Sequence, residues 1–210
     1  MIQHNCTGIL LAGGESKRFK GAEKSNLKVG NQRIIDRLMA VFKTVFSDIV
    51  IVSNQPRRFL EWDALIVTDI YDKRSSLTGI HTGLFYTQSE HAFIAACDAP
   101  FLHVDLVRKL LGYIDHQTDV IIPKTKLGYE PLCAIYSRRI LQPVQNALDR
   151  HKLKISSLFN RLAVKAIPES VLRKIDPDLI SFYNINTPED LELANRKVLD
   201  HGNRTAYSKN

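Results

Sequence analysis

The sequence contains few cysteines and no long apolar stretch. Its 210 residues include three cysteines, an odd number without the paired spacing of a metal site. Cys6, Cys97 and Cys133 lie in or beside apolar runs, which favours buried, reduced thiols over catalytic or metal-bound ones. No apolar run approaches the roughly 20 residues needed to cross a bilayer, and no basic segment precedes the short apolar run near the N-terminus. These absences predict a cytoplasmic protein without a membrane segment.

The two common glycine-rich nucleotide motifs, GK[ST] loops and GxGxxG, are also missing. Instead, the apolar run Thr7–Leu11 leads into adjacent glycines and then into basic residues. Backbone N–H groups beside paired glycines can turn toward an anion, so this stretch predicts a phosphate cradle. A tight strand-to-helix turn with a solvated basic face is the alternative. The residues proposed for the cradle and its charges are Leu11, Ala12, Gly13, Gly14, Arg18 and Lys24.

The length and charge limit the architecture and the partners. A chain of 210 residues suits one domain, which we place at residues 1–200, with a polar, basic tail at 201–210 that we expect to be disordered. A formal net charge of +7 favours acidic partners such as nucleic acid, a nucleoside triphosphate or a phosphorylated pterin. Aromatic residues do not alternate with the basic ones, which argues against nucleic acid.

Apolar periodicity predicts strands that alternate with helices. This order is typical of a Rossmann-like α/β fold. Such a fold has one doubly wound, mostly parallel sheet with helices on both faces. The expected strands are 49–53, 64–68, 93–97, 119–123, 129–136 and 181–185, and the expected helices are 33–47, 79–88, 104–115, 138–150, 155–162 and 188–199.

Three polar features follow strand-like runs and should therefore meet at the carboxyl ends of the strands. They are the glycine loop, Asp69 and Asp98. Asp98 would hold Mg²⁺ against phosphates, although capping of the next helix is an alternative. Asp69 is a candidate nucleotide contact, with Asp72 as a rival in the same loop, and Asn54 is either another contact or a local turn residue.

The order of LAGG, SxRF and GxxK, with ACDAP and NINTPEDL further on, resembles the molybdenum cofactor guanylyltransferase family. The resemblance implies a Mg²⁺-dependent transfer of GMP from GTP to the terminal phosphate of molybdopterin. It also implies that Asp98 binds the metal, that Asp69 belongs to the nucleotide site, and that Arg18 and Lys24 stabilise phosphate charge. Asn184 and Asn186 would reach the active-site edge as substrate contacts, and acceptor molybdoenzymes or other cofactor-biosynthesis proteins would be partners.

One stretch departs from the family pattern. Residues 75–79 read SSLTG where the family usually has GPLAG, a loop that in those relatives lies against the base. Transfer from CTP, or to a sugar phosphate, therefore stays open as an alternative. A protein that binds GTP without catalysis is a further one.

Overall fold

The structure, a computed structural model, describes residues 5–13 and 26–207, with side chains described up to residue 198. Its main element is a mixed sheet in the strand order β10-β7-β9-β6-β1-β4-β5, with β8 paired to β7 and a separate β2–β3 hairpin. The strands are β1 (Cys6–Leu11), β2 (Lys28–Val29), β3 (Gln32–Arg33), β4 (Ile49–Val52), β5 (Leu65–Val67), β6 (His91–Ala96), β7 (Val120–Thr125), β8 (Gly128–Tyr129), β9 (Cys133–Ser137) and β10 (Val164–Pro168).

The central strands are parallel. β1 pairs in parallel with β4 and β6, β4 with β5, and β7 with β10. Only β9, which is antiparallel to both β6 and β7, and the short β8 break this pattern in the described sheet. The predicted fold class is therefore confirmed, and the carboxyl ends of β1, β4, β5 and β6 point to the same side of the molecule.

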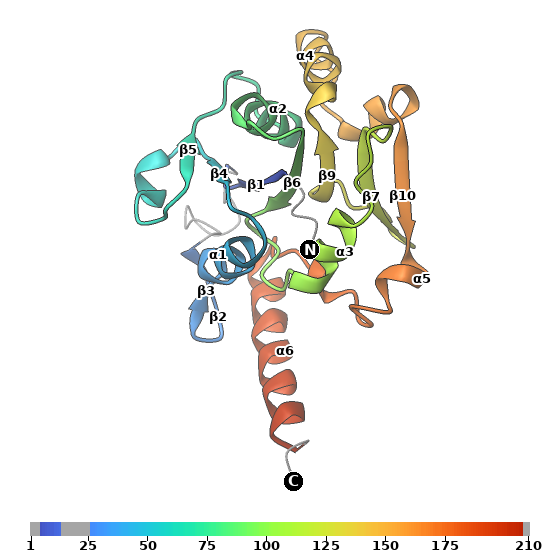
Figure 1. Cartoon of the computed structure of the whole chain (residues 1–210). Helices are drawn as coiled ribbons and strands as arrows, with labels where there is room; N and C mark the ends of the chain where they lie inside the picture. Colours follow the sequence, from blue (N-terminus) through green and yellow to red (C-terminus); the bar gives the residue numbers. More distant parts are fainter. Residues whose placement is uncertain (1–4, 14–25, 208–210) are drawn as a thin grey trace.

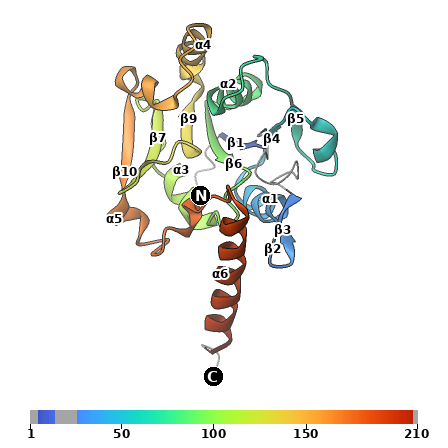
Figure 2. The ribbon, with the colours of Figure 1, turned by 180° about the vertical axis from the view of Figure 1, so that it is seen from behind.

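Helices cover both faces of the sheet, with α1 and α3 on one face and α2 and α4 on the other (Figures 1 and 2). The helix α6 projects away from this body toward the C-terminus (Figure 1). No helix in the described ranges is both long and apolar enough to span a membrane. The helices are α1 (Ile34–Val45), α2 (Ser76–Tyr86), α3 (Val104–Leu111), α4 (Leu141–Asp149), α5 (Glu169–Leu172) and α6 (Pro188–Tyr207), with 3-10 turns η3 (Pro56–Phe59), η4 (Arg138–Ile140), η5 (Ile155–Arg161) and η6 (Ile180–Phe182).

The core has two layers because side chains of a strand alternate between its faces. In β1, Leu10 packs with Phe42 of α1 on one face, whereas Ile9 packs with Ile80 of α2 on the other, and all four are fully buried. Helix α2 approaches the sheet closely because Gly83 has no side chain. A Cβ atom there would lie 2.6 Å from Cγ2 of Ile9.

Several boundaries differ from the sequence prediction. The single strand expected at 129–136 is divided into β8 and β9, because Pro131 lies between them and has no N–H for a ladder bond. The expected helix at 155–162 is a 3-10 turn, and the expected strand at 181–185 is a 3-10 turn followed by an extended segment. Helix α6 extends to Tyr207 and so includes residues 201–207 of the tail, whose disorder stays a prediction.

Candidate functional site

The hydrogen-bond ladder of the sheet continues past the ends of its central strands. Cys97, which follows β6, donates its N–H to Leu11 O at 3.0 Å, and Ala12, which follows β1, donates to Val52 O at 2.9 Å. These bonds fix the residues after β6, β1 and β4 side by side. We call this part of the molecule, formed by the residues that follow β1, β4, β5 and β6, the carboxyl edge.

The first part of the predicted phosphate cradle lies at the carboxyl edge. Leu11 and Ala12 are buried, whereas Gly13 is exposed. Among the described residues, the only atom within 4 Å of a Cβ atom built at Gly13 is Val52 O, at 3.9 Å. The remaining loop residues of the prediction, Gly14, Arg18 and Lys24, lie outside the described residues.

Asn54 and Asp69 form a reciprocal pair across the ends of β4 and β5. Asn54 Nδ2 donates to Asp69 Oδ2 at 2.8 Å, and the Asp69 N–H donates to Asn54 Oδ1 at 3.1 Å. The other carboxylate oxygen, Asp69 Oδ1, is buried and has no hydrogen-bond partner within the described ranges. The two predicted nucleotide contacts are therefore neighbours, and within the described ranges only one oxygen of Asp69 is hydrogen-bonded.

Burial changes the proton affinity of Asp69, the titratable member of this pair. Desolvation raises the pKa of Asp69, and the hydrogen bond from Asn54 partly opposes that rise. A carboxylate that is destabilised by burial gains more from a new hydrogen-bond donor than an exposed one does. The physical state of Asp69 thus suits a ligand with N–H or O–H groups.

Asp98 follows β6 and is held through its backbone by the C-terminal part of the chain. The N–H of Ile185, a fully buried residue, donates to Asp98 O at 2.9 Å. The neighbours of Ile185, Asn184 and Asn186, are both exposed. Their placement beside the Asp98 backbone agrees with the predicted approach to the active-site edge, while their contact with substrate stays a prediction.

The turn that follows these asparagines is a capping box at the start of α6. The Thr187 N–H donates to Asp190 Oδ2 at 2.8 Å, and the Asp190 N–H donates to Thr187 Oγ1 at 3.2 Å. Both bonds satisfy donors at the N-terminus of the helix. Thr187 is therefore the N-cap residue of α6, and the helix starts within the range that the sequence predicts.

The described residues supply few metal ligands, and the Cys6 thiol is unreactive. Within the described ranges, no three His, Cys, Asp or Glu side chains gather to hold a metal ion. Mg²⁺ bound with a nucleotide commonly needs only one or two carboxylates, since phosphate oxygens and water complete its shell. Asp98 fits that donor set. Burial raises the pKa of Cys6 to about 12, so this thiol stays protonated.

Sequence and structure comparisons agree on the family. The model of the "MobA-like NTP transferase domain" family matches residues 8–166. The chain is 46% identical to the molybdenum cofactor guanylyltransferase of Desulfosudis oleivorans over 91% of this chain and 95% of that one. The chain belongs to the MobA-like NTP transferase family. The resemblance seen in the sequence is thereby confirmed.

A solved structure of this family has the same architecture. The molybdopterin-guanine dinucleotide biosynthesis protein A from Archaeoglobus fulgidus superposes with a TM-score of 0.81 at 28% identity, covering 92% of this chain and 99% of that one. The shared fold thus covers nearly the whole length of both proteins.

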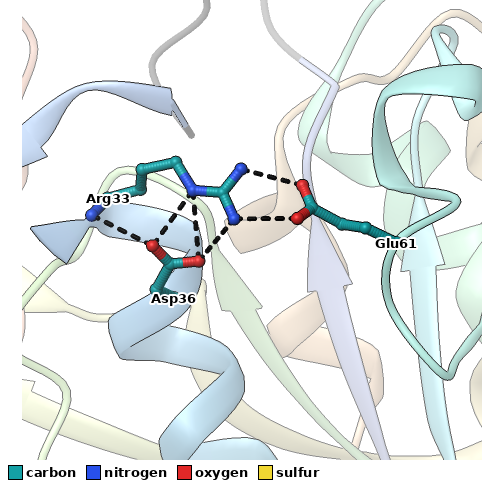
Figure 3. Close-up of polar contacts among 3 residues, drawn as sticks. All are labelled: Arg33, Asp36 and Glu61. Atoms are coloured by element: carbon teal, nitrogen blue, oxygen red, sulfur yellow. Dashed lines mark hydrogen bonds and ion pairs between the residues drawn. The ribbon is translucent and has the colours of Figure 1, made fainter.

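The MobA-like chain also contains an ion network that the sequence analysis missed. The Arg33 guanidinium donates two parallel hydrogen bonds to Glu61, at 2.8 and 2.9 Å, and further bonds to Asp36, the shortest at 2.7 Å (Figure 3). We call these three residues the Arg33 network. Arg33 and Asp36 are three residues apart at the start of α1, a spacing visible in the sequence. Glu61 lies far along the chain, and no sequence signal marks it.

Proposed function

We propose that this protein transfers GMP from GTP to the terminal phosphate of molybdopterin and releases pyrophosphate. The observation that carries the proposal is the meeting of Gly13, the Asn54–Asp69 pair and Asp98 at one edge of the sheet. The names of the D. oleivorans and A. fulgidus relatives support the guanine nucleotide and the molybdopterin acceptor. The reaction needs no membrane, and we place it in the cytoplasm.

The triphosphate would lie on the backbone of Leu11, Ala12, Gly13 and Gly14. Paired glycines leave the backbone N–H groups accessible to phosphate oxygens, and Gly13 is already exposed. From there the nucleoside would extend past the ends of β4 and β5 to Asn54 and Asp69. The ionised Asp69 would accept a hydrogen bond through Oδ1, the buried oxygen that lacks a partner among the described residues.

Charge stabilisation would carry the catalysis. The acceptor phosphate is already an anion at neutral pH, so the step needs no general base. Arg18 and Lys24 would stabilise the charge that builds on the transferring and leaving phosphates. Asp98 would hold a Mg²⁺ ion, which when bound supplies charge neutralisation and alignment of the phosphate oxygens. Asn184 and Asn186, which flank the segment docked on Asp98, would contact the substrate.

Transfer from CTP, or to a sugar phosphate, is the nearest alternative because residues 75–79 depart from the family pattern. The test uses wild-type protein with molybdopterin, Mg²⁺ and each of GTP, CTP, ATP and UTP, and identifies the product by mass spectrometry. We expect the guanine dinucleotide of molybdopterin and pyrophosphate from GTP only. Product from CTP instead would overturn the named substrate but keep the reaction, and no product from any nucleotide would overturn the proposal.

A further inference from the structure

A cavity of about 300 Å³ lies at the end of the sheet opposite to the carboxyl edge. It is lined by Thr7 near the start of β1, by residues 47–50 at the start of β4, by 63–65 at the start of β5 and by 86–88 at the end of α2. β1, β4 and β5 are parallel, so their starts lie on one side of the molecule. We call this space the amino-edge cavity. Small-molecule sites have volumes of roughly 300–1,000 Å³, so the cavity is large enough for a small ligand.

The described residues around the cavity carry negative charge only. Asp48 and Asp63 are the charged members of the lining, and both are exposed. Neither carboxylate forms an ion pair or a side-chain hydrogen bond with another residue in the described ranges. A chain with a formal net charge of +7 thus places two unpaired carboxylates at this cavity.

The end of α2 adds to this negative potential. A helix carries partial negative charge at its C-terminus, and a basic side chain in the last turn commonly offsets it. The last turn of α2 contains no basic residue. Tyr86 ends the helix and lines the cavity, so the negative end of the helix dipole lies at the cavity wall.

The two buried hydroxyls of the lining, those of Thr7 and Thr87, can accept a hydrogen bond from a ligand but cannot donate one. Thr87 Oγ1 donates to Thr7 Oγ1, which donates to Ser89 Oγ at 3.0 Å. Ser89 Oγ donates in turn to Asn5 Oδ1 at 2.9 Å. A hydroxyl has one hydrogen, so this chain of bonds uses all three. A ligand that reaches Thr7 or Thr87 must therefore supply the hydrogen.

Part of the cavity wall is apolar. Ile49 and Val50 are buried, whereas the side chains of Leu65 and Tyr86 are exposed, at 51% and 38% of their surface. Methylene groups gain free energy by packing on such side chains, and the face of a tyrosine ring also attracts cations. The cavity thus combines acceptors for N–H groups with a surface for an aliphatic chain.

We propose that the amino-edge cavity binds an aliphatic diamine or polyamine. Its ammonium groups would pair with Asp48 and Asp63, and its methylene chain would pack on Leu65 and Tyr86. An ammonium group has donors only, which suits the accepting hydroxyls. A bare metal ion would use the carboxylates but gain nothing from the apolar wall. This inference does not depend on the proposed guanylyl transfer, because no residue of the carboxyl edge lines the cavity.

The test titrates the nucleotide-free, full-length protein with spermidine at low salt, by calorimetry and by NMR of the backbone amides. Asp48→Asn and Asp63→Asn each remove one carboxylate. Asp178→Asn is the matched control, since Asp178 is also exposed but does not line the cavity. An aliphatic diol of similar length tests the chain without charge, and Mg²⁺ tests charge without the chain.

We expect saturable binding of spermidine at one site. The Kd should rise about threefold to tenfold in Asp48→Asn and in Asp63→Asn and stay unchanged in Asp178→Asn. The diol should not bind, and an equal concentration of Mg²⁺ should not displace spermidine. Absence of saturable binding, or the same Kd in all four proteins, would overturn the inference. Displacement by Mg²⁺ would also overturn it and indicate a metal site.

The NMR titration locates the bound ligand independently of the variants. The amide signals of Leu65 and Thr87 should shift as spermidine is added, whereas those of Gly13 and Asp69 should stay in place. Shifts confined to Gly13 and Asp69 would mean that spermidine binds at the carboxyl edge, which would contradict the proposed site.

Discussion

The Asn54–Asp69 pair and the Arg33 network are two carboxylate clusters in opposite physical states. Burial raises the pKa of Asp69, and one of its oxygens has no partner within the described ranges. In the Arg33 network, hydrogen bonds from the guanidinium lower the pKa of both Asp36 and Glu61. A carboxylate whose bonds are complete contributes to the fold, whereas a buried carboxylate oxygen without a partner among the described residues calls for an explanation, and a bound nucleotide is the one that we propose.

The two clusters also lie in different places. The pair is part of the carboxyl edge, where the ladder bonds of β1, β4 and β6 converge. The network joins the start of α1 to the connection between β4 and β5, and Glu61 is half-exposed. Exposed ion pairs contribute little free energy of unfolding. We therefore expect changes at the edge to affect activity, and changes in the network to affect mainly stability.

The largest expected difference in kcat is between alanine variants of two lysines, Lys24 at the proposed site and Lys43 beside the Arg33 network. Replacing Lys24 with alanine should lower kcat on the order of 100-fold, because the transferring phosphate loses a stabilising charge. Lys43→Ala is the matched control. Lys43 lies over the Trp62 ring, with its ammonium 5.4 Å from the ring centroid, beside the Arg33 network. Steady-state kinetics with GTP and molybdopterin measure both variants, and a Lys24→Ala enzyme with wild-type kcat would remove this residue from the mechanism.

At the pair itself, Asp69→Asn should raise the KM for GTP about tenfold or more, since a charged acceptor for the nucleotide is replaced by a neutral one. The network offers the comparison variant Asp36→Asn, which should leave this KM unchanged. Titration of GTP binding by calorimetry checks the same effect without turnover. Equal KM values for Asp69→Asn and wild type would show that the unpartnered oxygen has no role in nucleotide binding.

The contributions of the two clusters to the stability of the folded protein should change in opposite directions as the pH rises. The folded protein binds the Asp69 proton more tightly than the unfolded chain does, so ionised Asp69 costs stability as the pH rises through its raised pKa. Asp36 has a lowered pKa, so its stabilisation is present above the ordinary aspartate value and is lost as the pH falls through the lowered one.

Thermal unfolding across the acidic range measures both effects. Relative to wild type, the Tm of Asp69→Asn should rise with increasing pH, whereas that of Asp36→Asn should fall. Parallel pH profiles for the two variants would contradict the distinction between the clusters.

The smallest expected effect is that of Glu61→Gln. Kinetic parameters for GTP should stay within twofold of wild type, and the Tm should fall slightly because Arg33 loses a charged partner. High salt should reduce the difference in Tm, since salt screens exposed charges. A loss of activity comparable to that of Asp69→Asn would mean that the network acts in catalysis.

The sequence predicted the central strands and most of the carboxyl edge for a physical reason, whereas it missed β10 at the margin of the sheet. Buried parallel strands are continuous apolar runs, and the polar residue that follows each run marks its carboxyl end. Gly13, Asn54, Asp69 and Asp98 were all found in this way.

Long-range polar contacts leave no such mark. The bonds from Arg33 to Glu61 and from Ile185 to Asp98 O depend on how segments that are far apart in the chain pack together. The segment at 181–185 shows this limit, since its apolar pattern predicts a strand but only one of its N–H groups, that of Ile185, bonds to the Asp98 backbone. Burial of Ile185 against the core explains the apolar pattern.

The central claim is that the carboxyl edge transfers a nucleotide with Asp98 holding the metal. Its most direct test is pyrophosphate release from GTP and molybdopterin as a function of Mg²⁺ concentration, for wild type, Asp98→Asn and Glu61→Gln. We expect Mg²⁺-dependent release by wild type and Glu61→Gln, and a loss of roughly 100- to 1000-fold in Asp98→Asn. Release by Asp98→Asn at the wild-type rate and with the wild-type Mg²⁺ dependence would contradict the claim.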